Sequence, residues 1–158
     1  MLHIPSGLAA QSHDKRGLTL ALPAPLFALC LLLCPAAQAA DNTIFRSLAP
    51  DTATLNQYQW HYRPVVIFAP SETEANYVQQ MAMLKKTEAE LADRDIIVLS
   101  DTAPATQGQL RAQLKPQGFE VVLIGKDGGM KLRQQTPVSS AVLLSTIDSM
   151  PMRKAEQD

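Results

Sequence analysis

The chain has 158 residues, of which 46% are hydrophobic and 18% charged, and its formal net charge is −1 at pH 7. A chain with so little net charge, and with no long run of either sign, lacks the basic surface that nucleic-acid binding needs, so we expect no nucleic-acid partner. Its two cysteines, Cys30 and Cys34, both fall within the first 39 residues.

Those first 39 residues have the pattern of a secretory signal peptide. Two basic residues precede an apolar stretch over residues 17–35, which is followed by the small-x-small sequence Ala37-Gln38-Ala39. We expect cleavage after Ala39, and therefore a secreted protein, or a periplasmic one in a bacterium with two membranes. The alternative is an uncleaved membrane anchor, which the two prolines within the apolar stretch make less favourable. Because cleavage would remove this stretch, we expect no stable membrane insertion of the remaining chain.

Cleavage would leave 119 residues with 12 basic and 14 acidic side chains, no cysteine and a single histidine, His61. That length suits one domain, which we place at residues 55–158 after a loosely ordered lead-in at residues 40–54. Disulfides and thiol chemistry are excluded for this cysteine-free part of the chain. One histidine does not make a zinc site, so we expect neither a metal nor a cofactor.

The centre of the predicted fold is the stretch of residues 63–71. Residues 63–68 form an apolar, β-branched run that is typical of a strand buried on both faces. The spacing of Ser71 and Glu74 matches a capping box, and the apolar positions that follow predict one amphipathic helix of about twenty residues. This strand, turn and helix direct attention to the turn at residues 69–71, because ligands commonly bind at the carboxyl ends of such strands.

An aromatic segment precedes this strand. Tyr58, Trp60 and Tyr62 alternate with polar residues, which predicts an extended segment with an aromatic face. Aromatic side chains in this pattern are more often part of the core than of a binding surface. His61 falls on the opposite, polar face, where we expect it to be exposed.

The next elements complete a strand-helix-strand unit. Residues 95–100 are apolar and predict a second central strand, parallel to the first because a helix connects the two. After a turn-rich piece, Leu110 and Leu114 are four residues apart and predict a short helix that ends at Pro116.

The last part of the sequence predicts a hairpin and a helix. Residues 119–124 form a third strand, and Asp127-Gly128-Gly129 favours a tight turn into a returning strand at residues 130–133. Thr136 is placed to cap a final helix, with Pro137 in its first turn and Pro151 at its end.

This order of elements is that of an α/β thioredoxin-like fold. It has three layers, with helices on both sides of a mixed four-stranded sheet that combines a parallel pair with an antiparallel hairpin. Four pieces of the sequence resemble a bacterial domain-of-unknown-function family, which is similar to the peroxiredoxin-like domains of vertebrate sushi-repeat and coiled-coil-domain extracellular-matrix proteins. The pieces are residues 60–63, 94–95, 125–133 and 147–153.

The resemblance implies the fold but no redox activity. Thioredoxins and peroxiredoxins carry their reactive cysteine in the turn after the central strand, where this chain has Ala69-Pro70-Ser71. We therefore interpret this turn as a redox site without its nucleophile, in which Ser71 caps a helix.

Six residues are candidates for binding a ligand or a partner. Lys126, Lys131 and Arg133 could form a cationic spot for a carboxylate or a phosphate. The alternative is that these basic residues only protect an edge strand from pairing. The other three candidates are Ser71 and Glu72 in the turn and Arg63 at the start of the central strand. Arg63 and Asp148 could also be buried partners, of each other or of neighbours.

Two functional hypotheses follow, from different classes. The first is an exported, non-redox module that acts by binding, with a protein of the cell envelope as its partner. The second is an enzyme, either a hydrolase or an accessory of an oxidoreductase, that uses polar groups near Ser71. The sequence favours the first because no catalytic residue can be assigned.

Overall fold

The computed structural model describes residues 43–157. The predicted signal peptide and both cysteines lie outside the described residues. A five-stranded sheet, with strand order β1-β3-β2-β4-β5, forms the centre of the fold. Its strands are β1 (Phe45–Ser47), β2 (Arg63–Phe68), β3 (Ile96–Asp101), β4 (Glu120–Ile124) and β5 (Met130–Gln134).

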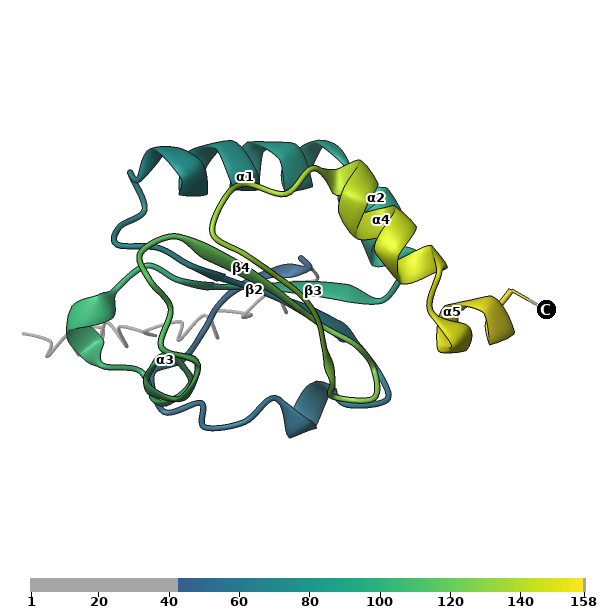
Figure 1. Cartoon of the computed structure of the whole chain (residues 1–158), viewed down its shortest axis with the longest axis horizontal. Coiled ribbons are helices and arrows are strands. Elements are labelled where there is room, and N and C mark those ends of the chain that lie inside the picture. Colours follow the sequence, from purple (N-terminus) through teal and green to yellow (C-terminus); the bar gives the residue numbers. More distant parts are fainter. Residues whose placement is uncertain (1–42, 158) are drawn as a thin grey trace, which may run out of the picture. The chain divides into compact units, whose positions relative to one another are not determined.

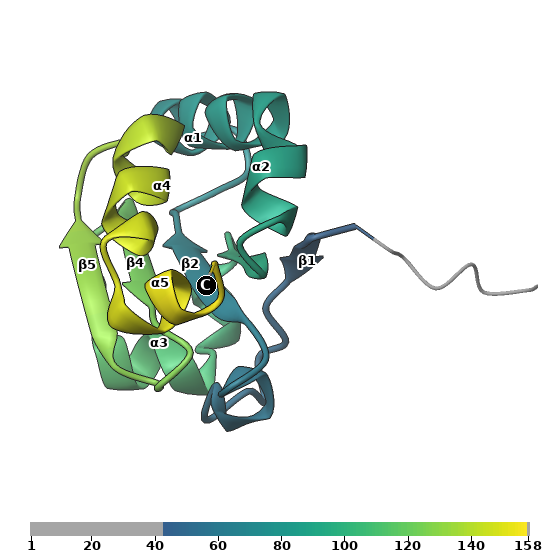
Figure 2. The same ribbon diagram turned by 90° about the vertical axis from the view of Figure 1, so that its right-hand side faces the viewer.

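Helices cover both faces of the sheet. As Figures 1 and 2 show, α1, α2 and α4 lie on one face and α3 lies on the other. The helices are α1 (Ala75–Lys86), α2 (Glu88–Ala92), α3 (Gln109–Leu114), α4 (Ser140–Asp148) and α5 (Pro151–Ala155), and the short 3-10 helices are η1 (Asn56–Tyr58) and η2 (Pro104–Thr106).

The pairing of the strands confirms the predicted mixed sheet. β2 pairs with β3 in parallel and with β4 in antiparallel orientation, and β4 and β5 form the predicted hairpin. The sheet has five strands rather than four, because β1 in the predicted lead-in pairs in parallel with β3. A hydrogen bond from Val98 N to Ile44 O, at 2.8 Å, extends this pairing by one residue.

All six residues of β2 are buried, as expected for a strand with cores on both faces. Val65 and Ile67 pack in the core under α1, α2 and α4, whereas Val66 and Phe68 pack in the core that α3 covers. This alternation follows from the two-residue period of a strand. β2 therefore fixes the positions of the groups at both of its ends.

Three of the predicted helix boundaries were wrong. Glu74, and not Ser71, caps α1, because its carboxylate accepts a hydrogen bond from Tyr77 N at 2.8 Å. The predicted twenty-residue helix is two helices that meet at Thr87. Ser139 caps α4 in place of Thr136.

The carboxyl-terminal part of the chain also differs from the prediction. Pro151 follows the end of α4, as expected, but it also occupies the first turn of a further helix, α5. Proline suits this position because its fixed φ is helical and a first-turn N–H has no partner within the helix. Within residues 43–157, none of the helices combines the length and the apolar character that crossing a membrane requires.

Candidate functional site

The turn after β2 is closed by hydrogen bonds from the protein itself. Ala69 is fully buried, and its N–H donates to Asp101 O at 2.9 Å. Arg111 Nη2 donates to Ala69 O at 3.2 Å. The hydroxyl of Ser71 lies 3.1 Å from that of Thr73, so its hydrogen-bond neighbour is another alcohol and not a base that could activate it. Glu72 is exposed and borders a shallow hollow beside α1.

An ion pair between a buried carboxylate and a partly buried arginine covers this turn on the α3 side of the sheet. Arg111 of α3 donates from Nε to Asp101 Oδ2 and from Nη2 to Asp101 O, both at 2.8 Å. Its guanidinium carbon also lies 5.3 Å from the centre of the Phe68 ring. No pattern in the sequence indicates this pair, because Arg111 is simply one polar position of a short predicted helix.

A second buried carboxylate lies on the other side of Phe68. Glu120 is the register partner of Phe68 across β2 and β4, and its side chain is 1% exposed. Arg133 Nη2 lies 2.8 Å from Glu120 Oε1, but that oxygen accepts no hydrogen bond of acceptable geometry. Arg133 instead donates to Leu114 O at 2.8 Å. The charges of Glu120 and Arg133 are thus opposite and close in space, but the two groups are not oriented for a hydrogen bond.

The opposite end of β2 carries a denser cluster of charges. Arg63 is fully buried, and it donates from Nη1 to Arg94 O at 2.9 Å and from Nη2 to Glu156 Oε1 at 3.0 Å. Lys126 Nζ donates to the same Glu156 Oε1 and to Asp95 Oδ2, each at 2.7 Å. Two cations from distant parts of the sequence therefore meet at one carboxylate oxygen.

The surroundings shift the pKa values of this cluster. Burial acts to raise the pKa of Glu156, but hydrogen bonds from Lys126 and Arg63 and the charges of both lower it to about 2. Burial likewise acts to lower the pKa of Lys126, but hydrogen bonds to Asp95 and Glu156 outweigh burial and raise it. Glu156 and Lys126 are thus both held in their charged forms.

A neighbouring set of ion pairs joins α5 and α4 to the segment before β3. Arg94 holds both oxygens of Asp148, at 2.8 and 2.9 Å, and this hydrogen bonding lowers the pKa of Asp148. Arg153 of α5 donates to Asp93 Oδ2 at 2.7 Å. Asp148 therefore pairs with Arg94 and not with Arg63, so of the two pairings considered from the sequence, with each other or with neighbours, the structure has the second.

The turn between β4 and β5 forms the rim of a hollow of about 320 Å³. Within the turn, Asp127 accepts from Gly129 N at 3.0 Å and from Lys131 Nζ at 2.6 Å, and its pKa is lowered chiefly by the hydrogen bond from Lys131. The hollow is lined by Asp127, Lys131, Thr146, Ser149, Met150, Pro151 and Met152.

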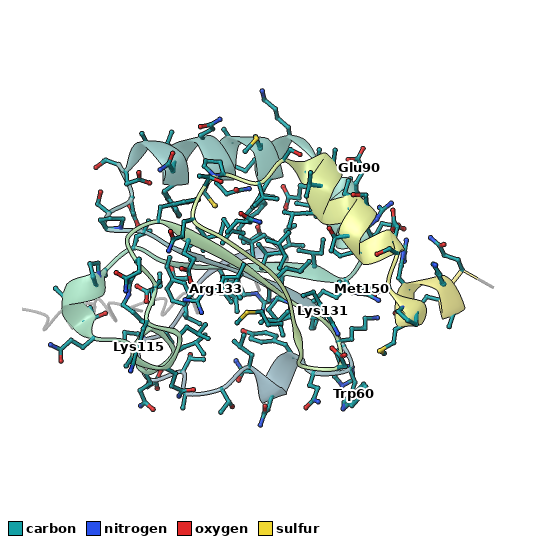
Figure 3. All side chains as sticks on the ribbon, viewed as in Figure 1. Trp60, Glu90, Lys115, Lys131, Arg133 and Met150 are labelled. Atoms are coloured by element: carbon teal, nitrogen blue, oxygen red, sulfur yellow. The ribbon has the colours of Figure 1, made fainter. Side chains whose placement is uncertain are left out.

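Trp60 lies beside the same turn (Figure 3). Its side chain is 59% exposed. The backbone N–H of Trp60 donates to Lys126 O at 2.7 Å. The backbone φ of Trp60 is 69°, in the left-handed region that tryptophan rarely adopts. Tyr62 is 42% exposed. The prediction of an extended segment with a core-facing aromatic side was therefore wrong, because η1 and a turn place Trp60 and Tyr62 at the surface.

The three predicted basic candidates do not gather into one cationic spot. Lys126 pairs with Asp95 and Glu156, Lys131 with Asp127, and Arg133 lies against Glu120. What the structure brings together is Lys126 with Arg63, through Glu156. Sequence reasoning missed Glu156, which lies 93 residues from Arg63 and follows the last helix. Among residues 43–157, no group of three or more potential ligands of the His, Cys, Asp and Glu types is placed to hold a metal ion.

Comparison with known proteins bears on the family and the fold. A family model described as "Domain of unknown function (DUF4174)" matches residues 54–156. The chain is 27% identical over 132 residues to coiled-coil domain-containing protein 80 of Danio rerio, covering 65% of this chain and 15% of that protein. It is 28% identical over 121 residues to the sushi repeat-containing protein SRPX of Rattus norvegicus, covering 66% of this chain and 26% of that protein.

The similarity to sushi-repeat and coiled-coil-domain proteins is thus confirmed, and the chain spans about a quarter or less of the length of these relatives. Among solved structures, the reduced 2-Cys peroxiredoxin of Plasmodium vivax matches with a TM-score of 0.50 and 14% identity, over 66% of this chain and 85% of that one. At this identity the likeness concerns the fold alone, which is thioredoxin-like.

Proposed function

The chain belongs to the domain-of-unknown-function family DUF4174, and on that premise we propose that it is an exported, non-redox thioredoxin-like module that binds a protein partner. The proposed contact area is the β4–β5 turn surface, which we define as Trp60, Asp127, Lys131, Met150 and Met152. Export is inferred from the pattern of residues 1–39, which lie outside the described part of the chain.

The state of the turn after β2 supports a role without thiol chemistry. Residues 40–158 contain no cysteine. The position that carries the reactive cysteine in thioredoxins and peroxiredoxins is occupied by Ala69-Pro70-Ser71, and Arg111 and Asp101 engage the backbone of Ala69. Ser71 has a hydroxyl neighbour and no base, so binding is better supported than hydrolysis.

The exposure of Trp60 is the observation on which the proposal rests. Large aromatic side chains contribute most to binding when they are exposed in the free protein and buried against a partner. Trp60 is 59% exposed and is held in a left-handed backbone conformation, so neither burial nor local backbone preference explains its presence there. The adjacent hollow of about 320 Å³, with two methionines in its lining, adds adaptable apolar surface.

The test is site-specific photocrosslinking in cells that export the protein. A photoreactive phenylalanine analogue replaces Trp60 in one variant and Val78 in the other, and crosslinked products are identified by mass spectrometry. Val78 is a matched control because it is 51% exposed but lies on α1, away from the β4–β5 turn. We expect a reproducible protein adduct at position 60 and none at position 78. The same products at both positions, or none at position 60, would contradict the proposed surface.

A second assay separates binding from redox catalysis. Purified protein is expected to show no disulfide-reductase activity and no thiol-dependent peroxidase activity, since residues 40–158 have no thiol. Turnover in either assay would reject the non-redox part of the proposal.

A further inference from the structure

The last helix is held to the rest of the protein mainly by charged side chains. None of the residues of α5 is buried. Arg153 attaches the helix to Asp93 at 2.7 Å, and Glu156, just after the helix, attaches it to Arg63 and Lys126. An element held by ion pairs and not by apolar packing is one that other ions can displace.

Beneath α5 lies a pair of cations that is ready to hold an anion. The side chains of Arg63 and Lys126 are only 1% and 10% exposed, and both point at Glu156 Oε1, at 3.0 and 2.7 Å. Two buried cations at this separation need an anion between them, because an uncompensated buried charge is strongly destabilising. Asp95 does not replace Glu156 in this role, since its carboxylate is 3.8 Å from Arg63 and is 44% exposed.

Glu156 leaves part of this site unused. Arg63 Nε is buried and makes no hydrogen bond. Nε and Nη2 lie on the same edge of a guanidinium group, and a carboxylate that meets this edge can accept from both nitrogens. Of the Arg63 nitrogens, only Nη2 donates to Glu156. A carboxylate that is not constrained by α5 could engage Nε as well, and would then satisfy a buried donor that Glu156 does not reach.

We propose that Arg63 and Lys126 form a carboxylate-binding site, which the chain fills with its own Glu156 and opens to a carboxylate of the protein partner when α5 is displaced. Lys126 lies in the β4–β5 turn, and its backbone carbonyl accepts a hydrogen bond from the backbone N–H of Trp60. The site therefore adjoins the β4–β5 turn surface. The source of the incoming carboxylate rests on the proposed function. The site itself does not, and it is tested with a small anion and no partner.

The experiment is chemical rescue of Glu156→Ala by acetate. The midpoint of thermal unfolding is measured for the wild type and the variant in sodium acetate, sodium chloride and sodium phosphate at equal ionic strength and pH 7. We expect acetate, relative to chloride, to raise the midpoint of Glu156→Ala by about 5 °C at ten times its dissociation constant, with a smaller effect on the wild type. Adding Lys126→Met to the variant should abolish the difference between acetate and chloride.

The matched control is Asp127→Ala, which removes an exposed carboxylate that is paired with a lysine at 2.6 Å. This variant should respond equally to acetate and chloride, because no buried cation is left behind. Equal responses of Glu156→Ala to acetate and chloride would overturn the proposal, and so would rescue by phosphate but not by acetate.

A second measurement, on the wild type, tests whether α5 can be displaced. Methyl-labelled methionine gives a nuclear magnetic resonance signal for Met152, which lies on α5 and is 38% exposed. Titration with acetate is expected to move this signal towards its position in Glu156→Ala, whereas chloride leaves it unchanged. A signal that responds alike to both salts would mean that Glu156 is a fixed structural partner. That result would overturn the proposal that another carboxylate replaces Glu156 at Arg63 and Lys126. A positive acetate result together with a negative crosslinking result would retain the site and reject the proposed surface.

Discussion

At the scale of a single residue, the proposed binding role of Trp60 is distinguished from a structural role by its effect on stability. We expect Trp60→Asn to leave the free energy of unfolding unchanged or to raise it by up to about 1 kcal/mol, because asparagine tolerates a positive φ better than tryptophan does. Little packing is lost, since the side chain is 59% exposed. Urea denaturation of wild type and variant measures this difference.

A matched comparison is Tyr58→Asn. Tyr58 is only partly exposed and packs against the core under α3, so its replacement is expected to be clearly destabilising. If Trp60→Asn lowered the free energy of unfolding as much as Tyr58→Asn does, Trp60 would have a structural role.

Residue patterns single out several charged side chains as candidates, but they do not predict which of these side chains meet. Arg63 and Lys126 stand out in the sequence because each adjoins an apolar strand or a tight turn. Their common partner, Glu156, is one glutamate near the end of the chain, and no local periodicity relates it to either cation. The same holds for Arg111 and Asp101, which a turn-rich segment separates. Such contacts depend on how elements pack, which spacing along the chain does not encode.

At the scale of elements, Gln80 joins α1 to the segment before α4. It is fully buried, its Oε1 accepts from Val138 N at 2.6 Å and its Nε2 donates to Val138 O at 2.9 Å. We expect Gln80→Leu to lower the free energy of unfolding by about 3 kcal/mol, because both buried backbone groups of Val138 lose their partners. The measurement is urea denaturation. Gln79→Leu, at an exposed neighbouring position, is the control and should change stability by less than about 0.5 kcal/mol.

The elements that the sequence predicts well are those with strong local signals. β2 and β3 are unbroken apolar runs, and Asp127-Gly128-Gly129 has the residues that a tight turn requires, with Gly128 at a φ of 81°. The sequence pattern does not predict β1, because a three-residue strand is too short to show periodicity. Only the pairing of β1 with β3 defines this strand. The division between α1 and α2 was missed for a related reason, since the hydroxyl of Thr87 bonds to Ser140 of a distant helix at 2.8 Å.

The attachment of α5 is expected to depend on pH. The pKa of Glu156 is about 2 in the folded protein, below its ordinary value of 4.5, so its ionised form contributes stability. That contribution is complete above about pH 4.5, decreases as the pH falls, and is lost below about pH 2. Thermal unfolding of wild type and Glu156→Gln between pH 6 and pH 2 measures it. We expect the wild type to have the higher midpoint at pH 6 and the two midpoints to converge near pH 2. A constant difference would contradict an ionised Glu156 as the anchor.

At the scale of the whole molecule, the two ends of β2 have different characters. The carboxyl end, where thioredoxins and peroxiredoxins carry out thiol chemistry, is closed by Arg111 and Asp101. The amino end carries buried cations, the ion pairs that attach α5, and the exposed Trp60. This distribution supports the proposal that a partner binds at the amino end of β2, remote from the turn where thioredoxins and peroxiredoxins carry their reactive cysteine.

The part of the chain after residue 39 is also expected to be independent of covalent crosslinks. Signal-peptide cleavage predicts that the exported protein begins at Ala40, which intact-mass measurement of the secreted or periplasmic fraction can establish. Because residues 40–158 contain no cysteine, a reducing agent should leave the midpoint of thermal unfolding unchanged. A full-length or lipid-modified mass would contradict the predicted cleavage. A clear fall of the midpoint on reduction would contradict a cysteine-free exported chain, since without a thiol the chain can form no disulfide, either within itself or with another molecule.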